Sequence, residues 1–337
     1  MKNKNELNCK DFIIEDDSLK KYIGDESIVT IPNVSRICFG AFYSCLNVKK
    51  IIIPNTVKEI DAGAFYECFS LESVEIPSSV THIKGPIFNY CDSLKEVIVD
   101  KENPVYDSRD NCNAIIETKT NALISACSNS FIPKSIESIN RMSFGESELL
   151  KEITIPSSVT KIEDEALMYC INLKKVEILC KKILDLGNDV LLGCFELESL
   201  TISCFKEFEI SDSGKSKYHI GSLFGESEYP DSYRIHYLLS KDKNKTFYLP
   251  NSLKHVILKD MKSVPFVSFF GCDSITHIEL PRSIERIENG AFACCTGLVD
   301  ITYNGTMSEW NAIEKEDYWD DATGDYTIHC LNGDIKK

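Results

Sequence analysis

The sequence lacks the long apolar runs of a membrane protein. No segment contains the roughly 20 consecutive apolar residues that a membrane-spanning helix needs. Basic residues are also scarce relative to acidic ones: 37 Lys and Arg stand against 52 Asp and Glu, which gives a formal net charge of −15. An acidic surface repels nucleic acid and anionic membrane surfaces. We therefore expect no membrane insertion and no nucleic-acid partner.

Enzyme motifs are missing as well. The patterns G-x-S-x-G, H-E-x-x-H and G-x-G-x-x-G do not occur, and the adjacent Cys294 and Cys295 have no histidine close by in the sequence to act as a base. Cys-x-x-Cys pairs, which are typical of structural zinc sites, are absent too. We expect that the chain is not an enzyme and that it has no catalytic residues, no metal site and no cofactor.

The start of the chain has no recognisable export signal. Residues 1–22 contain lysines but neither the apolar core nor the small-residue cleavage site of a signal peptide. The sequence as given therefore predicts a cytoplasmic location. A cell-surface or secreted location is the alternative, because an export signal that had been removed would leave the same sequence.

What the sequence does contain is a repeat. Equivalent positions recur every 23 residues: Pro54 and Pro77, Val57 and Val80, Phe65 and Phe88, and Cys45, Cys68 and Cys91. A fixed period of this length is typical of a solenoid, in which each coil packs only on its neighbours. The repeat therefore predicts the architecture before any single residue is considered.

The repeat unit explains how such a coil is built. Its copies share the pattern LxxVxIPxSVxxIxxxAFxxCxx, which is clearest at residues 71–93 and 275–297. The end of LxxVxI alternates as a short strand does, and the following proline ends that strand because it cannot donate to a β-ladder. SVxxI and AFxxC supply two further apolar rows. No coil can bury these rows alone, so the pattern predicts a β-rich solenoid of about ten coils with little α-helix.

Two interruptions break the regular pattern. Residues 100–130 contain short apolar pairs separated by the turn-forming sequence TKTN, which predicts a hairpin-like excursion. Residues 205–249 are less regular and rich in Tyr and Phe. The predicted organisation is an N-terminal cap at 1–27, a solenoid at 28–303 with insertions at 100–130 and 205–249, and a C-terminal cap at 304–337.

Several copies of the repeat identify a family. The segments are IPNTVKEIDAGAFYEC, IPSSVTHIKGPIFNYC, IPSSVTKIEDEALMYC and LPRSIERIENGAFACC. They resemble the BspA-like leucine-rich repeats, because the spacing, the proline, the AF pair and the cysteine recur together over nearly the whole chain. The resemblance implies a right-handed superhelix of the leucine-rich-repeat type. It also implies adhesion or protein binding, and export in most members of the family.

The fifteen cysteines follow the repeat rather than forming close pairs. Seven of them, at equivalent positions of the repeat, each end an apolar stretch such as AFYEC or IFNYC. A cysteine in that place acts as a small inward-facing hydrophobe. Parallel Cβ vectors in a ladder of coils do not favour the torsion of a disulfide. We therefore expect reduced thiols.

Two clusters could be read as metal sites. His255 and His277 occupy the same repeat position and should stack on adjacent coils about 5 Å apart. With Glu279 two residues on they could hold a metal, but no third ligand has the proper spacing. The acidic segment 314–325 lacks the D-x-D-x-D-G order of a calcium loop. Solvated histidines and an exposed acidic cap are the preferred interpretations.

The strand face of the solenoid is the predicted binding surface. Side chains between the buried strand positions should face solvent, and their acids and threonines suit a protein or peptide ligand with basic groups. The chain is expected to act as a monomeric, non-enzymatic scaffold. The period places Glu75, Glu177 and Glu279 on one face. The full set of candidate binding residues is Glu75, Thr154, Glu177, Thr201, Glu279 and Thr302.

A glycan-binding surface module is the alternative. It depends on the aromatic insertion 205–249, because sugar rings stack on exposed aromatic faces. In that case the insertion, and not the strand face, would be the functional surface.

Overall fold

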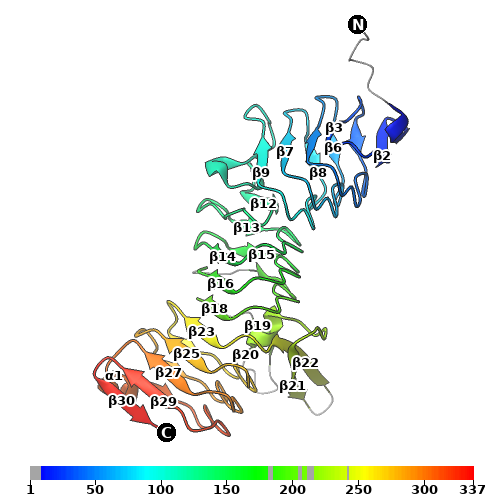
Figure 1. Ribbon diagram of the computed structural model, residues 1–337. Coiled ribbons are helices and arrows are strands. Elements are labelled where there is room, and N and C mark those ends of the chain that lie inside the picture. Colours follow the sequence, from blue (N-terminus) through cyan, green and yellow to red (C-terminus); the bar gives the residue numbers. More distant parts are fainter. Residues whose placement is uncertain (1–8, 181–184, 204–206, 211–215, 241–242) are drawn as a thin grey trace. The chain divides into compact units, whose positions relative to one another are not determined.

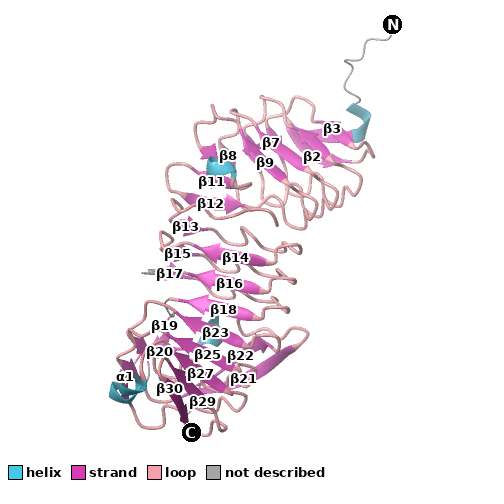
Figure 2. Ribbon diagram, turned by 60° about the vertical axis from the view of Figure 1, so that its left-hand side comes forward, coloured by secondary structure: helices cyan, strands magenta, loops and turns pink. Residues whose placement is uncertain are grey.

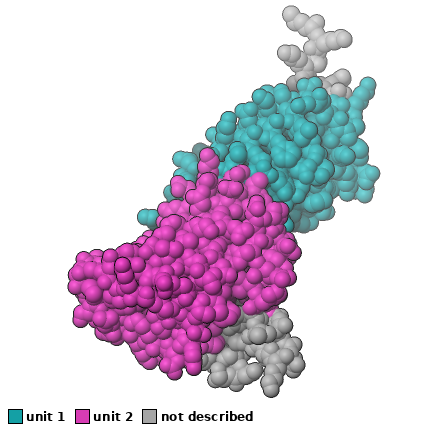
Figure 3. Space-filling view, turned by 60° about the horizontal axis from the view of Figure 1, so that its bottom comes forward, with its two compact units in different colours: residues 1–150, 162–170 teal, residues 151–161, 171–337 magenta. Residues whose placement is uncertain are grey.

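A computed structural model describes residues 9–180, 185–203, 207–210, 216–240 and 243–337. The chain is a β-solenoid of about 12 turns with almost no helix, which confirms the predicted repeat architecture (Figures 1 and 2). Among the described residues the only α-helix is α1 (Met307–Ala312). None of the described helices is long and apolar enough to cross a membrane. The chain divides into unit 1, residues 1–150 and 162–170, and unit 2, residues 151–161 and 171–337 (Figure 3).

One coil of unit 1 shows how the repeat becomes structure. In β7 (Ser73–Ile76), Val74 and Ile76 are buried while Glu75 faces outward. Pro77 follows the strand, and its carbonyl accepts a hydrogen bond of 3.1 Å from the N–H of Val80, which closes a turn. The chain then passes through a second short strand and a turn that carries the AF row. The three apolar rows therefore point into one interior, as the pattern predicts.

Unit 1 contains two ladders of short strands and an excursion. One sheet is parallel: β3 (Ile28–Thr30), β5 (Lys50–Ile52), β7 and β9 (Glu96–Val99). The other sheet begins, after η1 (Cys9–Asp11), with an antiparallel hairpin formed by β1 (Phe12–Glu15) and β2 (Ser18–Tyr22). It continues in parallel through β4 (Arg36–Ile37), β6 (Glu59–Ile60) and β8 (His82–Ile83). In the excursion, β10 (Tyr106–Asp107), β11 (Ile115–Glu117) and β12 (Ala122–Ser125) pair antiparallel in that order, and η2 (Arg109–Asn111) lies between β10 and β11. The next strand, β13 (Ser138–Ile139), pairs parallel to β12.

Unit 2 is built on an eight-stranded sheet. Its strands are β14 (Glu152–Ile155), β16 (Lys175–Ile178), β18 (Ser199–Ile202), β23 (His255–Leu258), β25 (His277–Leu280), β27 (Asp300–Tyr303), β29 (Thr327–Cys330) and the antiparallel edge strand β30 (Gly333–Lys336). A smaller sheet contains β24 (Ser263–Val264), β26 (Arg286–Ile287) and β28 (Glu314–Lys315). The remaining elements are β15 (Lys161–Ile162), β17 (Asp185–Leu186), β19 (Glu207–Ile210), β20 (Ser216–Tyr218), η3 (Ile220–Leu223), β21 (Ser232–Ser240) and β22 (Lys243–Pro250).

The AF row forms stacks of aromatic rings in the core of each unit. Phe65 is fully buried, and its ring centroid lies 5.6 Å from that of Phe42 and 5.9 Å from that of Phe88. In unit 2 the rings of Phe269 and Phe292 stack in the same way at 5.4 Å. Each buried ring removes a large apolar area from water, so this row contributes strongly to the stability of each coil.

The repeated cysteines make one recurring hydrogen bond. The thiol of Cys91 donates to the backbone carbonyl of Phe65 at 3.1 Å, across a separation of 26 residues. Three other coils repeat the contact: Cys68 to Phe42 at 3.1 Å, Cys170 to Phe144 at 3.2 Å and Cys295 to Phe269 at 2.9 Å. A small apolar side chain with a weak donor meets both needs of this position, because it fills the core and also contacts a buried carbonyl. None of these four cysteines is in a disulfide in the structure.

Residues of the predicted C-terminal cap, 304–337, pack against the core ring of Phe292 in unit 2. The hydroxyl of Thr306 accepts from the N–H of Glu309, and the Glu309 carboxylate accepts from the N–H of Thr306, so a capping box starts α1. Trp319 lies edge-to-face against Phe292, with 6.0 Å between ring centroids, and against Trp310 at 6.2 Å. These indole rings take the place of the next coil.

Candidate functional site on the strand faces

The outward row of the eight-stranded sheet contains five of the six predicted binding residues. Parallel register places Thr154, Glu177, Thr201, Ile257, Glu279 and Thr302 side by side on successive strands. The row arises because side chains alternate between the two faces of a strand, so the two neighbours of each residue in the row point into the core. The sequence period therefore predicted the row correctly within unit 2.

Two of the predicted residues do not fit a single exposed row. Glu75 belongs to the four-stranded sheet of unit 1, because the ladder that contains it ends at β9 and a new ladder starts at β14. Thr201 is only 1% exposed, and its hydroxyl has no hydrogen-bond partner among the described residues. The expectation of one continuous acidic face through Glu75, Glu177 and Glu279 is therefore corrected, and Thr201 is not an accessible binding residue.

The two acids of this row, Glu177 and Glu279, already have partners. Lys175 holds Glu177 in an ion pair of 3.0 Å and lowers the pKa of that carboxyl, and Thr154 donates to the same carboxylate at 3.2 Å. Glu279 accepts a hydrogen bond of 2.7 Å from the side-chain amide of Asn304. Half-buried, paired carboxylates lose existing contacts when a ligand binds, so they are weaker recognition points than unpaired ones.

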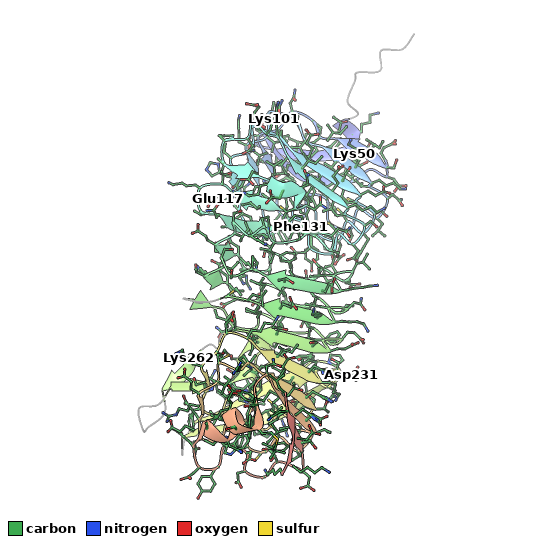
Figure 4. The ribbon with its side chains drawn as sticks, turned by 90° about the vertical axis from the view of Figure 1, so that its left-hand side faces the viewer. Lys50, Lys101, Glu117, Phe131, Asp231 and Lys262 are labelled. Carbon is green, nitrogen blue, oxygen red and sulfur yellow. The ribbon has the colours of Figure 1, made fainter. Side chains whose placement is uncertain are left out.

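Glu75 has a different environment. On the outward row of the unit 1 sheet it lies between Ile52 and Ile98, which are 42% and 43% exposed. No hydrogen bond or ion pair to its carboxylate occurs among the residues that the structure describes. A hollow of about 440 Å³ borders this row, and its lining residues are Lys50 (labelled in Figure 4), Ile51, Ile52, Ile53, Pro54, Asn55, Glu75, Pro77 and Asp100. Ile52, Glu75 and Ile98 are named the strand patch here.

A second polar row of unit 2 links histidines and aspartates. The rings of His255 and His277 stack with centroids 4.7 Å apart, which confirms the predicted stack. His277 Nε2 lies 3.0 Å from one oxygen of Asp300, and His329 Nε2 lies 2.9 Å from the other. His329 Nδ1 in turn lies 3.0 Å from Asp334. No group of three or more His, Cys, Asp or Glu in the described part of the chain has the arrangement of a metal site.

The pairing of His329 leads to a pH-dependent prediction. Asp300 first, and then Asp334, raise the pKa of His329 above its usual 6.5, because both ring nitrogens face carboxylates. A raised pKa in the folded state stabilises the C-terminal hairpin below pH 6.5, and this contribution is lost as the pH rises through the folded value. NMR titration should therefore give a lower His329 pKa in Asp334→Asn than in the parent. Equal midpoints would contradict the pairing.

Most of the described aromatic side chains of the insertion 205–249 pack against the solenoid, and Tyr248 is half-buried. Of the aromatic side chains that the structure describes there, Phe224, Tyr229 and Phe247 are buried. Tyr233 accepts a hydrogen bond from Ser274 at 3.1 Å and burial raises its pKa, so it too packs against the solenoid. The side chains of Tyr218 and Tyr237 lie outside the described residues. The alternative of a glycan surface in 205–249 therefore has no support from these described rings.

These features define a leucine-rich-repeat scaffold, and comparison with known families agrees. The family model of the BspA type leucine rich repeat region, with six copies, matches residues 13–113, 114–213 and 231–314. The chain belongs to this family. No curated protein matches the chain.

Solved structures of bacterial leucine-rich repeat proteins are similar. A leucine-rich cell surface protein from Faecalibacterium prausnitzii is 25% identical, with a TM-score of 0.47, over 86% of this chain and 63% of its own. This chain therefore spans less than two thirds of that protein. The pneumococcal vaccine antigen PcpA is 16% identical, with a TM-score of 0.50, over 92% of this chain and 69% of its own. The second similarity supports the fold alone.

Proposed function

We propose that the chain is a non-enzymatic, adhesion-type scaffold that binds a protein or peptide partner on the strand face of unit 1. The strand patch carries the proposal: an unpaired carboxylate at Glu75 stands between two exposed isoleucines beside a hollow. Exposed apolar side chains offer area to bury, and the carboxylate selects a basic group. The family is one of repeat scaffolds, and leucine-rich repeats generally mediate protein interactions.

Cell-surface display is part of this proposal. The Faecalibacterium protein is a cell surface protein, and PcpA is a vaccine antigen. A scaffold on the outside of a cell would meet host or neighbouring proteins directly. These relatives support the surface alternative and give the cytoplasmic expectation no support.

The test uses a random peptide display library selected against the full chain. We expect enriched peptides to combine an apolar residue with Lys or Arg. Their affinity should fall about tenfold or more in Ile52→Asn with Ile98→Asn, because apolar contact area is lost and each amide must be desolvated on binding. Affinity should also fall in Glu75→Lys, because like charges then meet.

A matched control separates the patch from general surface effects. Leu149→Asn with Val299→Asn changes two other exposed apolar residues by the same chemistry. All variants should keep the parent's melting temperature, since exposed side chains contribute little to folding. Equal loss of affinity in both double variants would contradict the strand patch as the binding site.

A further inference from the structure

A groove lies in unit 1 where the row of AF turns loses one member. In a regular coil the turn donates to the turn of the next coil, as the N–H of Phe65 donates to the carbonyl of Ile87 at 3.2 Å. After Ile87 the excursion contributes only two residues at this level. Ser125 Oγ accepts from the N–H of Ile87 at 3.1 Å, and the N–H of Ala126 donates to Ser143 at 2.8 Å. The next AF turn is therefore one coil further away than in a regular stack.

Small residues leave this part of the surface open. The turns that border the groove carry, at one repeat position, Phe39, Ala62, Gly85 and Arg141. Ala62 and Gly85 have little or no side chain, so the groove extends between Phe39 at one end and Arg141 at the other. It measures about 360 Å³, and every residue that lines it belongs to unit 1. This volume falls in the range of small-ligand sites, about 300–1,000 Å³.

Phe39 forms an aromatic wall of the groove. It is 70% exposed, although its ring packs against Gly63: a Cβ atom on that glycine would come within 2.8 Å of the ring. The backbone of Phe39 is fixed as well, because its N–H donates to Asp61 at 3.3 Å. Arg36 in turn holds Asp61 through a guanidinium pair of 2.7 and 3.2 Å. The ring is thus held on one side and open to a ligand elsewhere.

Polar side chains with unused hydrogen-bonding capacity also line the groove. The side-chain amide of Asn140 makes no hydrogen bond within the described part of the chain, and it offers both donors and an acceptor. Lys84 is held by Asp61 at 3.1 Å. Arg141 is held by Glu165 at 2.5 Å. Each cation keeps further N–H donors, yet its charge is compensated by its partner.

We propose that this groove binds a neutral sugar ring of a glycan, with the ring stacked on Phe39 and its hydroxyl groups bonded to Asn140, Lys84 and Arg141. A sugar has apolar C–H faces and hydroxyl groups that both donate and accept. It therefore suits an aromatic wall beside side chains of both kinds. The site shares no residue with the strand patch or with the insertion 205–249, so it is a second function beyond the proposed one.

A peptide fits the groove less well. Extended peptides are recognised largely through main-chain hydrogen bonds. The main-chain groups of the groove are already used, since the carbonyl of Gly63 accepts from Gly40 at 3.2 Å and the carbonyl of Pro86 accepts from Gly63 at 2.8 Å. Polar contacts to a ligand must then come from side chains, as they do for sugar hydroxyl groups.

A charged ligand also fits less well. Lys84 and Arg141 are the cations that line the groove, and both already pair with acids. An acidic glycan would have to displace those acids, and a basic ligand would meet the two cations. Charge complementarity therefore favours a neutral sugar.

The test applies the full chain to a printed glycan array that carries neutral glucans, mannans, galactans and N-acetylhexosamine chains beside sialylated glycans. We expect binding to neutral glycans. Isothermal titration calorimetry with the strongest of them should show an affinity about tenfold or more lower in Phe39→Ala, because the stacking surface is lost. Phe39→Tyr keeps the ring and should change the affinity less than about twofold.

Phe131→Ala is the matched control. Phe131 (labelled in Figure 4) is another exposed phenylalanine of unit 1, at 48%, and its loss should change the affinity less than about twofold. Ala62→Leu fills the groove and should weaken binding as strongly as Phe39→Ala does. Ile52→Asn with Ile98→Asn should leave glycan binding unchanged, so this proposal and the strand patch are tested separately. Parent-like melting curves of the Phe39 variants establish that folding is intact.

Five outcomes would overturn the proposal. The first is an array on which the parent binds no neutral glycan, and the second is binding of sialylated glycans alone. Equal weakening in Phe39→Ala and Phe131→Ala would show that exposed rings adsorb the glycan without a site. Binding that survives Phe39→Ala and is lost in Tyr248→Ala would place the sugar on the insertion 205–249. Peptide binding that depends on Phe39, without glycan binding, would assign the groove to a peptide.

Discussion

Replacing Phe292 by alanine is expected to lower the free energy of unfolding by about 3–5 kcal/mol. The Phe292 ring is fully buried between Phe269, at 5.4 Å, and Trp319, at 6.0 Å, so the substitution removes contacts with the preceding coil and with the cap together. The stacked rings cannot close the resulting space without shifting two neighbouring turns. Urea denaturation of the full chain, followed by intrinsic fluorescence, measures the change.

The control for this variant is Tyr318→Ala in the same cap. Tyr318 is 70% exposed, so its loss should change the free energy of unfolding by less than about 0.5 kcal/mol. In a repeat protein each coil contacts only its neighbours, so hydrogen exchange in Phe292→Ala should increase mainly in the last coils of unit 2. An unchanged urea midpoint in Phe292→Ala would mean that the AF row does not support the coils as described.

The sequence period predicted the coil but not where a ladder stops. Val74, Glu75 and Ile76 take the inward and outward positions that the pattern indicates, because alternation along a strand follows from backbone geometry. The same pattern cannot show that the excursion after β9 pairs with itself, since β11 and β12 form antiparallel bonds between residues that do not repeat. For this reason the sequence predicts one long face for Glu75, Glu177 and Glu279, whereas Glu75 lies on the separate four-stranded sheet of unit 1.

The aromatic insertion shows the limit of composition as a guide. Tyr and Phe in a polar segment can form a binding platform or a local core, and the sequence does not distinguish the two. In the structure Phe247 stacks on His219 with centroids 5.2 Å apart, and burial lowers the pKa of His219 to about 4. Large rings that find neighbouring apolar surface are buried by the hydrophobic effect.

The repeat period also makes part of one surface cluster visible, the stacked rings of Tyr43 and Tyr66. Tyr43 and Tyr66 occupy the same position after AF, and Glu67 follows directly. Glu146 carries no such signal, because it meets Tyr66 only through the folding of a coil 80 residues further on. Contacts between distant coils at non-repeating positions need the structure.

The thiols of the cysteine ladder are expected to be almost unreactive in the folded protein. Burial raises the pKa of Cys170 and of Cys295 from 9.0 to about 12. Since the thiolate is the reactive form, a shift of this size reduces the reactive fraction about a thousandfold at pH 8, and the packed core excludes reagent in addition. Unfolding should therefore accelerate alkylation of these two residues by at least this factor, which timed iodoacetamide labelling and peptide mass mapping can measure.

Cys330 provides the internal comparison, because its side chain is half-buried near the chain surface. It should be labelled before Cys170 and Cys295 in the native protein, and unfolding in urea should then make nearly all fifteen cysteines reactive. The Cys170 and Cys295 thiols donate to carbonyls of the preceding coil, so labelling them requires the coils to separate. Their labelling rate then reports local opening of the solenoid. Native labelling of Cys170 as fast as that of Cys330 would show that the ladder is open to solvent.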